Sequence, residues 1–599
     1  MTFQGFTATT RPEQGPPRLA ALRAAMSDEG LAGFLIPRSD AHQGEYVAPR
    51  DDRLAWLTGF TGSAGFCIAL EDRAAVFVDG RYRLQVRSQV DLSAFSPVDW
   101  PETSHGEWLA RNLGEGVVGF DPWLHSAEEI QKLETALAGT GVALRRCENL
   151  IDRVWPDQPA PPAAPVTAHP LDLAGESSAD KRARLAQTLR DQGQRAAVIT
   201  LPDSICWLLN IRGADIPRNP VVHAFAILHA DARLSLFIDP AKIEGLPPEV
   251  TEGVDIHPPS AFGHALQALS GPVRVDKASA PLAVSDWLSE PPVWAADPCI
   301  LPKARKNAAE LAGARAAHLR DGVAMVKFLA WLDGETGALT EIDVARKLEA
   351  FRAASDLLRD ISFDTIAGAG PNGAIVHYRV TEDTNRPVAD GQILLVDSGG
   401  QYADGTTDIT RTVARGRAGE DERRAFTRVL QGMIAISRAR FPKGRAGRDI
   451  DALARYPLWL AGQDYDHGTG HGVGAFLSVH EGPQRIARTG EVPLEPGMIL
   501  SNEPGYYRPG AFGIRIENLI VVQEAPPLAG ADDRAMLSFE TLTLCPIDRR
   551  LIVAEMLSGD ERDWLNAYHA RVRDELLPLL SGEMGGETAD WLIAATAPV

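Results

Sequence analysis

The spacing of apolar and polar positions divides the chain into predicted helices and strands. Within the first 155 residues, apolar positions recur at helical spacing around Leu19 and Leu22, and residues 32–37, 66–70 and 74–78 are short apolar runs typical of buried strands. A helical pattern followed by such strands predicts an α/β domain over residues 1–155.

The segment after residue 155 begins with a linker and then repeats this pattern. Residues 156–165 are too rich in proline for a helix or a central strand. Beyond them, DSICWL at 203–208 resembles DRLAWL at 52–57, and LSLFID at 234–239 resembles AAVFVD at 74–79. We therefore expect a second α/β domain over residues 171–302, related to the first; two unrelated domains of one class are the alternative.

The remainder of the chain has a different pattern. A long helical periodicity covers residues 308–333, glycine-punctuated strands then dominate to about Val522, and a final helical pattern starts at Ser558. We expect a third domain over residues 303–540 and an extension over residues 541–599.

Composition and charge exclude several classes of protein. A chain of 599 residues is too long for one hydrophobic core. Its content of 45% hydrophobic and 23% charged residues is that of an ordinary globular protein. The net charge of -20 argues against nucleic-acid binding, which needs a basic face.

Cysteine usage and hydropathy point to a reducing compartment. The five cysteines are scattered and contain no CxxC pair, which argues against a disulfide framework and a thiolate zinc site. We expect them to be buried small apolar residues. The N-terminus has no signal-peptide core, and no run approaches about 18 apolar residues, so we predict a cytoplasmic protein without a membrane anchor. These cysteines are Cys67, Cys147, Cys206, Cys299 and Cys545.

Two aspartates lie at the ends of predicted strands in the region 303–540. Asp397 ends an apolar run, and Asp408 begins the next strand-like segment after several glycines that permit a tight reversal. A buried aspartate after such a run is costly unless it is paired or bound to a metal. Taken alone, each residue is better explained as a turn at a strand end; taken together, their carboxylates can point to one place.

Two glutamates occupy similar positions further on. Glu503 follows the apolar residues 498–500, and Glu517 alternates with apolar neighbours, which places it on the same strand face as Arg515. Individually, these carboxylates fit a structural Arg–Glu pair or an exposed face.

A glycine-rich stretch supplies histidines. His471 lies in DHGTGHGVG at 466–474. We interpret these glycines as clearance for a peptide.

The joint pattern predicts a dinuclear metal centre. Four carboxylates and one imidazole suffice for two divalent ions if two of the carboxylates bridge. The four negative charges then balance the two dications, and a hydroxide can bind between the ions as one further anion. Oxygen-rich ligation favours manganese or cobalt over structural zinc. Paired ions lower the pKa of a bound water and orient a carbonyl, which is hydrolase chemistry. The candidate ligands are Asp397, Asp408, His471, Glu503 and Glu517.

Three other histidines lie in glycine-rich settings of the same region, namely His377, His467 and His480. Each is predicted to donate a hydrogen bond to a substrate carbonyl or a developing oxyanion. A lone histidine is more often structural. We apply that reading to His42, His105, His318 and His569.

These segments resemble the pita-bread metallopeptidases, and specifically the Xaa-Pro aminopeptidase (aminopeptidase P) family. The motifs are GPNGAIVHY, LLVDSGGQYADGTTDITRT, DHGTGHGVGAFLSVHEGP, SNEPGYY and AFGIRIEN. Similarity also covers DAHQGEYVAPRDDRLAWLTGFTGSAG near the start, NIRGADIPRNPVV in the middle and TLTLCPI near the end. The chain resembles the long, cytosolic, three-domain form.

The resemblance implies an α/β (α+β) fold: two creatinase-like domains, then a pita-bread catalytic domain with a short helical extension. It implies that Asp397 binds one manganese ion, that His471 and Glu503 bind the other, and that Asp408 and Glu517 bridge them. Cobalt or zinc are the alternative metals.

The implied reaction is hydrolysis of the Xaa–Pro bond by a bridging hydroxide. Glu503 would handle the proton and His480 would stabilise the tetrahedral intermediate, with His377 and His467 framing the substrate. All eight positions match the family pattern, which argues against an inactive homologue.

Partners also follow from the resemblance. The expected substrates are peptides with proline second, the expected assembly is a homodimer, and neither nucleic acid nor membrane is expected. Arg81 in DGRY and Tyr507 in NEPGYY are candidate pocket residues. A structural role is the alternative for both: Tyr507 stacking on Pro504, and Arg81 pairing within a turn.

Four other functions share features with this pattern. Prolidase and methionine aminopeptidase share the ligands, but the N-terminal domains and the C-terminal extension favour the Xaa-Pro aminopeptidase. Creatinase-like enzymes share the fold without metals, and non-catalytic pita-bread binding modules typically lose the ligands. The complete ligand set disfavours both.

Overall fold

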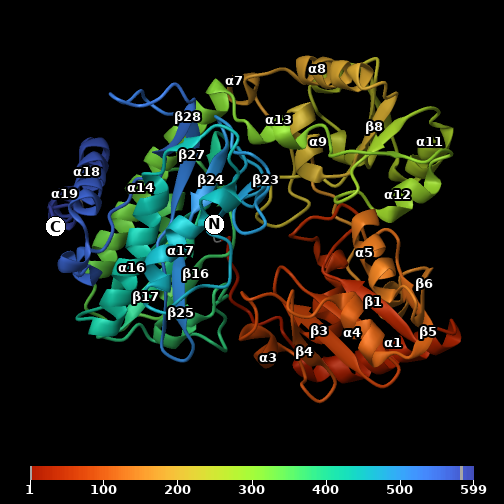
Figure 1. Cartoon of the computed structure of the whole chain (residues 1–599), viewed down its shortest axis with the longest axis horizontal. Coiled ribbons are helices and arrows are strands. Elements are labelled where there is room, and N and C mark those ends of the chain that lie inside the picture. The colour runs from red at the N-terminus through yellow and green to blue at the C-terminus, as the bar shows by residue number, and fades with distance from the viewer. Residues whose placement is uncertain (1–2, 581–584) are drawn as a thin grey trace. The chain divides into compact units, whose positions relative to one another are not determined.

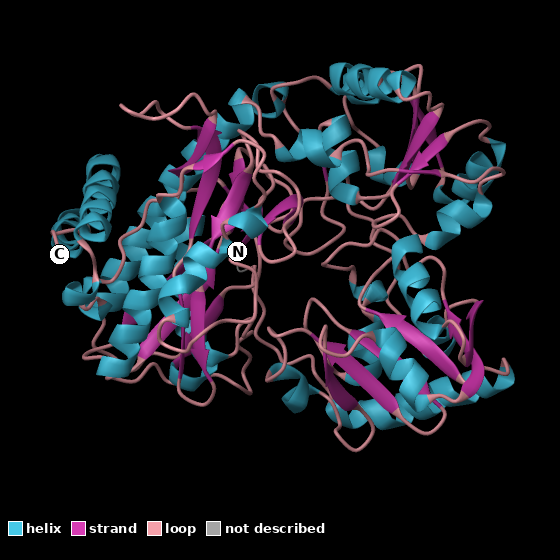
Figure 2. Ribbon diagram, viewed as in Figure 1, coloured by secondary structure: helices cyan, strands magenta, loops and turns pink. Residues whose placement is uncertain are grey.

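The computed structural model describes residues 3–580 and 585–599, which form two compact units. The N-terminal unit is Thr9–Lys303, and the C-terminal unit combines residues 1–8 with Ala304–Val599. Each unit contains mixed helices and strands (Figures 1 and 2). None of the described helices has both the length and the apolar composition needed to cross a membrane.

The first half of the N-terminal unit is built on a mixed sheet with helices on both faces. Its strand order is β4 (Ser96–Asp99), β3 (Ala74–Val78), β2 (Phe66–Leu70), β1 (Gly33–Pro37), β5 (Glu115–Phe120) and β6 (Gly141–Arg146). Alternate residues of β1 enter different cores. Phe34 and Ile36 pack with α1 (Gly15–Asp28), whereas Leu35 packs with α4 (His105–Asn112) and α5 (Ala127–Leu137).

The second half repeats this topology. The order is β12 (Val254–His257), β11 (Leu234–Phe237), β10 (Phe225–His229), β8 (Ala196–Ile199), β13 (Val273–Val275) and β14 (Val293–Trp294). In both sheets the strand that comes first along the chain pairs antiparallel with the second and parallel with the fifth. These pairs are β1 with β2 and β5, and β8 with β10 and β13.

The two sequence echoes occupy equivalent places in these sheets. DRLAWL coincides with α2 (Arg53–Thr58) and DSICWL with α9 (Pro202–Leu209), each between the first and second strands. The other pair coincides with β3 and β11. The prediction of two related α/β domains is confirmed.

The C-terminal unit holds two principal sheets. One has the order β16 (Ile366–Ala369), β17 (Ile393–Ser398) and β20 (Ile409–Ala414). The other has the order β21 (Phe441–Pro442), β28 (Met536–Thr541), β27 (Asn518–Glu524), β24 (Ile499–Asn502), β22 (Gly470–Gly472) and β23 (Glu481–Ile486). A hairpin of β25 (Gly505–Arg508) and β26 (Phe512–Arg515) joins β24 to β27 along the chain.

Helices cover the sheets of this unit. The predicted long helix is α14 (Ala308–Gly334), which begins with a capping box between Asn307 and Glu310. It packs with α15 (Glu341–Ala353) on the apolar side chains of β17 and β20. Helices α16 (Glu420–Ser437) and α17 (Asp451–Trp459) contact each other, and α16 packs against β26.

The C-terminal extension docks on this unit through α18 (Gly559–Leu576) and α19 (Gly585–Ala595). The Tyr568 hydroxyl donates to the carbonyl oxygens of Thr543 and Cys545, and the backbone N–H of Ile547 donates to Nε2 of His569. Both side chains are buried. The extension is therefore part of the folded unit.

The start of the chain belongs to the C-terminal unit, although the sequence predicted it as part of the first domain. The backbone N–H groups of Phe3 and Gln4 donate to the Glu349 carboxylate, and the Gln4 amide exchanges two hydrogen bonds with Thr365. Phe6 is buried beside Ile342. These contacts are with residues more than 300 positions away, which no local pattern reveals.

Candidate metal centre

The five candidate ligands lie on or next to strands of the C-terminal unit. Asp397 is on β17, Asp408 directly precedes β20, and His471 is on β22. Glu503 follows β24, and Glu517 lies in the gap between β26 and β27. All five side chains are buried or half-buried.

Pairing of β17 with β20 sets the positions of the two aspartates. The strands are antiparallel, with Asp397 opposite Thr410 and Ser398 opposite Ile409. At Gly399, a Cβ atom would lie 1.9 Å from the carbonyl oxygen of Thr407, so this close turn excludes a side chain.

The imidazole of His471 lies between two carboxylates. Its Nδ1 is 2.9 Å from the carbonyl oxygen of Gly472, which can only accept, so the proton is on Nδ1. Its Nε2 lies 3.5 Å from Oδ2 of Asp408 and 3.4 Å from Oε1 of Glu503. Nε2 is therefore directed at the carboxylates, with its lone pair available to a metal in this tautomer.

Thr410 positions Glu517 beside Asp408. Its carbonyl accepts the backbone N–H of Glu517 at 3.1 Å, and its hydroxyl donates to Oε2 of Glu517 at 2.8 Å. Ligand-type atoms of Asp408, His471 and Glu517 all lie within 4.8 Å of one another. Carboxylate oxygens from two sheets thus meet one imidazole nitrogen.

The charges in this cluster fit bound cations. Burial, followed by the negative charge of Asp408, raises the pKa of Glu517 well above its usual range. Burial also raises the pKa of Asp397 and Glu503, against the lowering effects of Arg515 on Asp397 and of His471 on Glu503. The buried oxygens Asp397 Oδ1, Asp408 Oδ1 and Glu517 Oε1 accept no hydrogen bond from the described residues. Oxygens without donors in a crowded anionic site suit divalent ions.

Arg515 is a site residue that the sequence reasoning did not assign. Its Nη2 donates to Oδ2 of Asp397 at 2.5 Å, its Nη1 donates to the Tyr507 hydroxyl at 2.6 Å, and its Nε donates to the Thr410 hydroxyl. Arg515 does lie on the predicted face with Glu517, since both reach Thr410. Its carboxylate partner is Asp397, however, which lies 118 positions away. The alternation of apolar and polar residues around Arg515 cannot reveal so distant a partner.

His467 and Tyr507 extend this network away from the cluster. Nδ1 of His467 donates to the carbonyl oxygen of Gly468 at 2.7 Å, so Nε2 accepts from the Tyr507 hydroxyl at 2.9 Å. That hydroxyl in turn accepts from Arg515. Burial raises the pKa of Tyr507 to about 12, so it stays protonated. A chain of hydrogen bonds thus links Asp397 to His467.

The remaining predicted histidines are His480 and His377. The ring of His480 stands edge-on to that of His471, with centroids 4.3 Å apart. His377 is half-buried in the turn after the short helix η5 (Gly370–Ala374), which contacts β26. His480 is therefore adjacent to a candidate ligand, and the role of His377 stays a prediction.

The glycines of the 466–474 stretch serve a purpose other than the predicted one. A Cβ at Gly470 would lie 1.9 Å from the Ser501 carbonyl oxygen, and one at Gly472 would lie 2.4 Å from the Glu481 carbonyl oxygen. The interpretation as clearance for a peptide is wrong at these positions, because the space is filled by neighbouring strands of the same sheet.

Arg81 has structural partners in its own unit. Its Nη2 lies 2.7 Å from Oδ2 of Asp79, its Nη1 lies 3.8 Å from Oε1 of Glu45, and its guanidinium packs over the ring of Tyr82. Its assignment to the substrate pocket stays a prediction.

Other residues predicted to be structural are buried, except Cys147 and His105, which are half-buried. The five cysteines are free thiols; Cys147 is half-buried and the others are buried. His42, His318 and His569 are buried and His105 is half-buried.

A second group of ligand-type atoms occurs in the N-terminal unit, at Asp40, Asp51 and His223. Here the carboxylates already have partners: Oδ2 of Asp40 lies 3.3 Å from Nε2 of His223, and Asp51 pairs with Arg53 at 2.9 Å. Arg53 is therefore the protein cation that already pairs with this group.

Family models match four consecutive segments. They are a creatinase/prolidase N-terminal domain at residues 18–154, a further creatinase/prolidase N-terminal domain at 157–310, metallopeptidase family M24 at 312–524, and the C-terminal region of peptidase M24 at 535–599.

Individual proteins match along the whole chain. A probable Xaa-Pro aminopeptidase P from Laccaria bicolor is 41% identical over 97% of this chain and 93% of its own length. Aminopeptidase P2 from Arabidopsis thaliana is 39% identical over 97% of this chain and 88% of its own length.

A solved structure agrees. The X-prolyl aminopeptidase of Caenorhabditis elegans, described as a cytosolic enzyme with a di-nuclear active site, superimposes with a TM-score of 0.92 and 34% identity, covering 98% of this chain and 100% of the nematode chain. The chain therefore belongs to the Xaa-Pro aminopeptidase P family, within metallopeptidase family M24.

Proposed function

We propose that this protein is a dinuclear metalloaminopeptidase that releases the first residue from peptides with proline in second position. The observation that carries the proposal is the cluster of the Asp408, Glu503 and Glu517 carboxylates around His471. In it, Oδ1 of Asp408 and Oε1 of Glu517 are buried and accept no hydrogen bond from the described residues. The full-length relatives named as Xaa-Pro aminopeptidases support the substrate class.

Two divalent ions are proposed at this cluster, with manganese as the resident metal and cobalt or zinc as alternatives. Asp397 would hold one ion, His471 and Glu503 the other, and Asp408 and Glu517 both. When bound, such a pair lowers the pKa of a water and polarises a peptide carbonyl. The charges of four carboxylates and two dications nearly cancel. Bound ions would therefore remove the repulsion among the carboxylates that is present in the metal-free site.

The chain's own residues would move the protons and hold the substrate. Glu503, which accepts from the Ser501 hydroxyl at 3.0 Å, would take and return a proton. His480, edge-on to His471, would stabilise negative charge developing on the carbonyl oxygen. His467 and His377 would frame the peptide, with Tyr507 fixing the orientation of His467.

Matched peptides test the reaction. Xaa-Pro-Yaa should lose its first residue, Xaa-Ala-Yaa should not, and an Xaa-Pro dipeptide should be a poor substrate. Preference for the dipeptide would identify a prolidase instead, and cleavage of none of the three would support a non-catalytic binding module.

A substitution tests the proton role. Glu503→Gln should lower kcat by at least about a hundredfold, the usual effect of losing a general acid–base. Glu491→Gln is the matched control, because Glu491 is exposed and, among the described residues, forms an ion pair with exposed Arg448 alone. A Glu503→Gln enzyme that keeps most of its turnover would remove Glu503 from this role.

Metal analysis tests the cofactor. Purified protein should carry close to two divalent ions per chain, and manganese should restore activity after chelation. Full activity in metal-free protein would contradict the mechanism.

A homodimer in the cytosol is also proposed. The nematode relative is described as cytosolic. In the C-terminal unit, Leu453, Tyr456 and Trp459 on α17 and the adjacent Leu460 are exposed to 44%, 58%, 45% and 72%. A second copy of the chain would bury this apolar face.

Light scattering should give twice the chain mass, and Leu460→Glu should shift the protein toward monomer; an unchanged mass would place the interface elsewhere.

We further propose domain bounds of 1–155, 171–302, 303–540 and 541–599, although the described residues 3–8 group with the C-terminal unit. The family matches at 18–154, 157–310, 312–524 and 535–599 support this division.

A further inference from the structure

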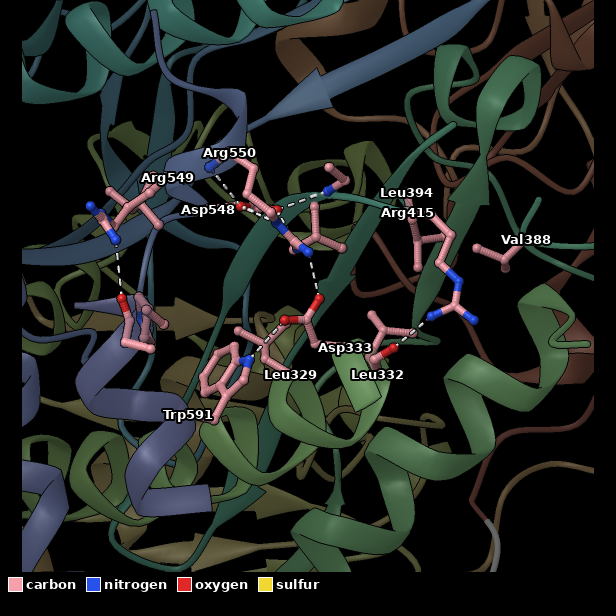
Figure 3. A pocket seen from close by; sticks show the side chains of 16 residues that line it. Leu329, Leu332, Asp333, Val388, Leu394, Arg415, Asp548, Arg549, Arg550 and Trp591 are labelled. Carbon is pink, nitrogen blue, oxygen red and sulfur yellow. Dashed lines mark hydrogen bonds and ion pairs between the residues drawn. The ribbon is translucent and has the colours of Figure 1, made fainter. Parts of the chain in front are cut away.

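A cavity of about 220 Å³ lies in the C-terminal unit between α14, the strands β17 and β20, the segment 546–550 and α19 (Figure 3). Its volume suits a small organic molecule more than a single water. Most of its wall is apolar. The apolar side chains that line it include Leu329, Leu332, Val388, Leu394, Val413 and Trp591.

Charged groups line the same cavity, and their pairing leaves it positive. Arg550 pairs with Asp333 at 2.5 Å and with Asp548 at 2.8 Å, so one guanidinium serves both carboxylates of the wall. Arg415 and Arg549 donate to backbone carbonyls, and among the described residues no carboxylate pairs with either. The lining therefore carries three guanidinium groups against two carboxylates.

The unneutralised cations keep unused hydrogen-bonding capacity. Nε of Arg549 is buried without an acceptor among the described residues. Arg415 donates from Nη1 to Leu332 and from Nη2 to Glu335, which uses two of its five N–H groups. Figure 3 shows the Arg415 side chain along the cavity, next to Leu332. A buried or half-buried guanidinium without a counter-ion favours an anion.

We propose that this cavity binds a small amphipathic monocarboxylate, an acid with a short alkyl or aryl body. The body would lie against Leu394, Val413 and Trp591, and the carboxylate would meet Arg415. The single negative charge of such an acid balances the one excess positive charge of the cavity lining. A carboxylate also accepts two hydrogen bonds from the fork of N–H groups on a guanidinium. No group outside the cavity is required for this recognition.

The cavity lies on the opposite face of the sheet from the candidate metal centre. On β17, Asp397 contributes to the metal cluster, whereas Leu394, an odd number of residues earlier, faces the other side. Leu394 is paired in register with Val413 of β20, and both line the cavity. A ligand here would touch the sheet and α19 together, and would stabilise the docked C-terminal extension without contacting substrate or metal.

Octanoate is the probe, with 1-octanol and acetate as controls that lack the charge or the body. Calorimetric titration of the full-length protein should detect octanoate binding, and a thermal melt should show that octanoate raises the Tm. In both measurements 1-octanol and acetate should have a weaker effect or none. Because binding does not involve the metal centre, it should persist in the Glu503→Gln variant. An unsubstituted protein that bound octanoate but cleaved none of the matched peptides would count against the proposed function and not against this proposal.

Two variants locate the site. Arg415→Met should weaken octanoate binding about tenfold through loss of the charge-assisted hydrogen bonds, whereas Arg417→Met, an exposed arginine two residues along, should leave it unchanged. Ala595→Phe on α19 places a ring at the cavity wall and should abolish binding without a large change in the Tm of the ligand-free protein. No detectable binding of octanoate, or equal binding in all variants, would overturn the proposal.

Discussion

The position of His471 between Asp408 and Glu503 determines how the metal-free site handles protons. Burial lowers the pKa of His471, but the hydrogen bond with Asp408 and the charge of Glu503 outweigh it and raise the pKa to about 9. At pH 7 the metal-free imidazole is therefore protonated. A metal needs the neutral ring, so a metal ion must displace this proton.

We expect metal affinity to fall as the pH drops below about 9, by about tenfold per unit for each proton displaced. Isothermal titration of manganese into chelated protein at pH 7, in buffers with different ionisation enthalpies, should show net proton release. The control is His471→Ala, in which the release should shrink by about one proton. Heats that do not depend on the buffer would contradict this protonation state.

Tyr507 is expected to act through His467. Removing the hydroxyl in Tyr507→Phe deletes the donor to Nε2 of His467 and one acceptor of Arg515. We expect kcat/KM to fall about tenfold, corresponding to the ~1.4 kcal/mol of one hydrogen bond. If the effect passes through the imidazole, Tyr507→Phe should add little in a His467→Ala background. Additive losses in this double-mutant cycle would assign Tyr507 an independent role.

At this scale the sequence predicted some contacts and missed others for a definite reason. Asp397 and Glu503 were predicted because a carboxylate after an apolar run leaves a visible trace. The partner of Arg515 was not, because the Arg515–Asp397 contact joins two sheets that only the fold brings together. The glycines at 470 and 472 were misread because a neighbouring strand, not the sequence around them, fills the space.

At the scale of elements, helix α18 is held by a neutral histidine. His569 is fully buried and accepts the backbone N–H of Ile547 on Nε2. Burial, followed by the nearby Arg411, lowers the pKa of His569 to about 3. In the unfolded chain the same group titrates near 6.5. The folded state therefore binds fewer protons than the unfolded state between these values.

This difference makes docking of α18 acid-sensitive. The stability associated with neutral His569 is fully present above pH 6.5 and is lost as pH falls toward 3, by up to about 1.4 kcal/mol per pH unit. We expect His569→Gln to lower stability at pH 7.5 and to reduce its dependence on pH, measured by urea unfolding between pH 7.5 and 5. Exposed His264→Gln is the control and should change neither. An unaltered pH dependence in His569→Gln would show that other groups dominate acid unfolding.

Regular elements with strong periodicity were the most predictable part of the fold. Strands β2 and β3 coincide with the predicted runs 66–70 and 74–78, and α14 extends one residue beyond the predicted 308–333. The predicted strand that carries Arg515 and Glu517 on one face is instead divided into β26 and β27, with Ile516 and Glu517 between them. There, the backbone N–H of Glu517 bonds to Thr410 of the other sheet, a tertiary contact that interrupts a locally continuous pattern.

At the scale of the whole molecule, the described beginning of the chain contributes to the unit that carries the candidate metal centre. Phe6 is buried beside Ile342 and Val380 of the C-terminal unit, whereas Thr9 onward belongs to the N-terminal unit. If the two units unfold separately, a core truncation should destabilise only the unit whose core it enters, regardless of its position along the chain.

Phe6→Ala should therefore lower the calorimetric transition of the C-terminal unit, by about 3 kcal/mol in stability, because it removes a buried ring and leaves a cavity. Phe95→Ala is the matched variant, since Phe95 is buried in the core of the N-terminal unit. The transition of the C-terminal unit is recognised independently by its upward shift when manganese is added, because a ligand stabilises only the unit that binds it. Phe95→Ala should lower the transition that does not respond to manganese. If Phe6→Ala instead lowered the transition that manganese does not shift, residues 3–8 would stabilise the N-terminal unit rather than the C-terminal unit.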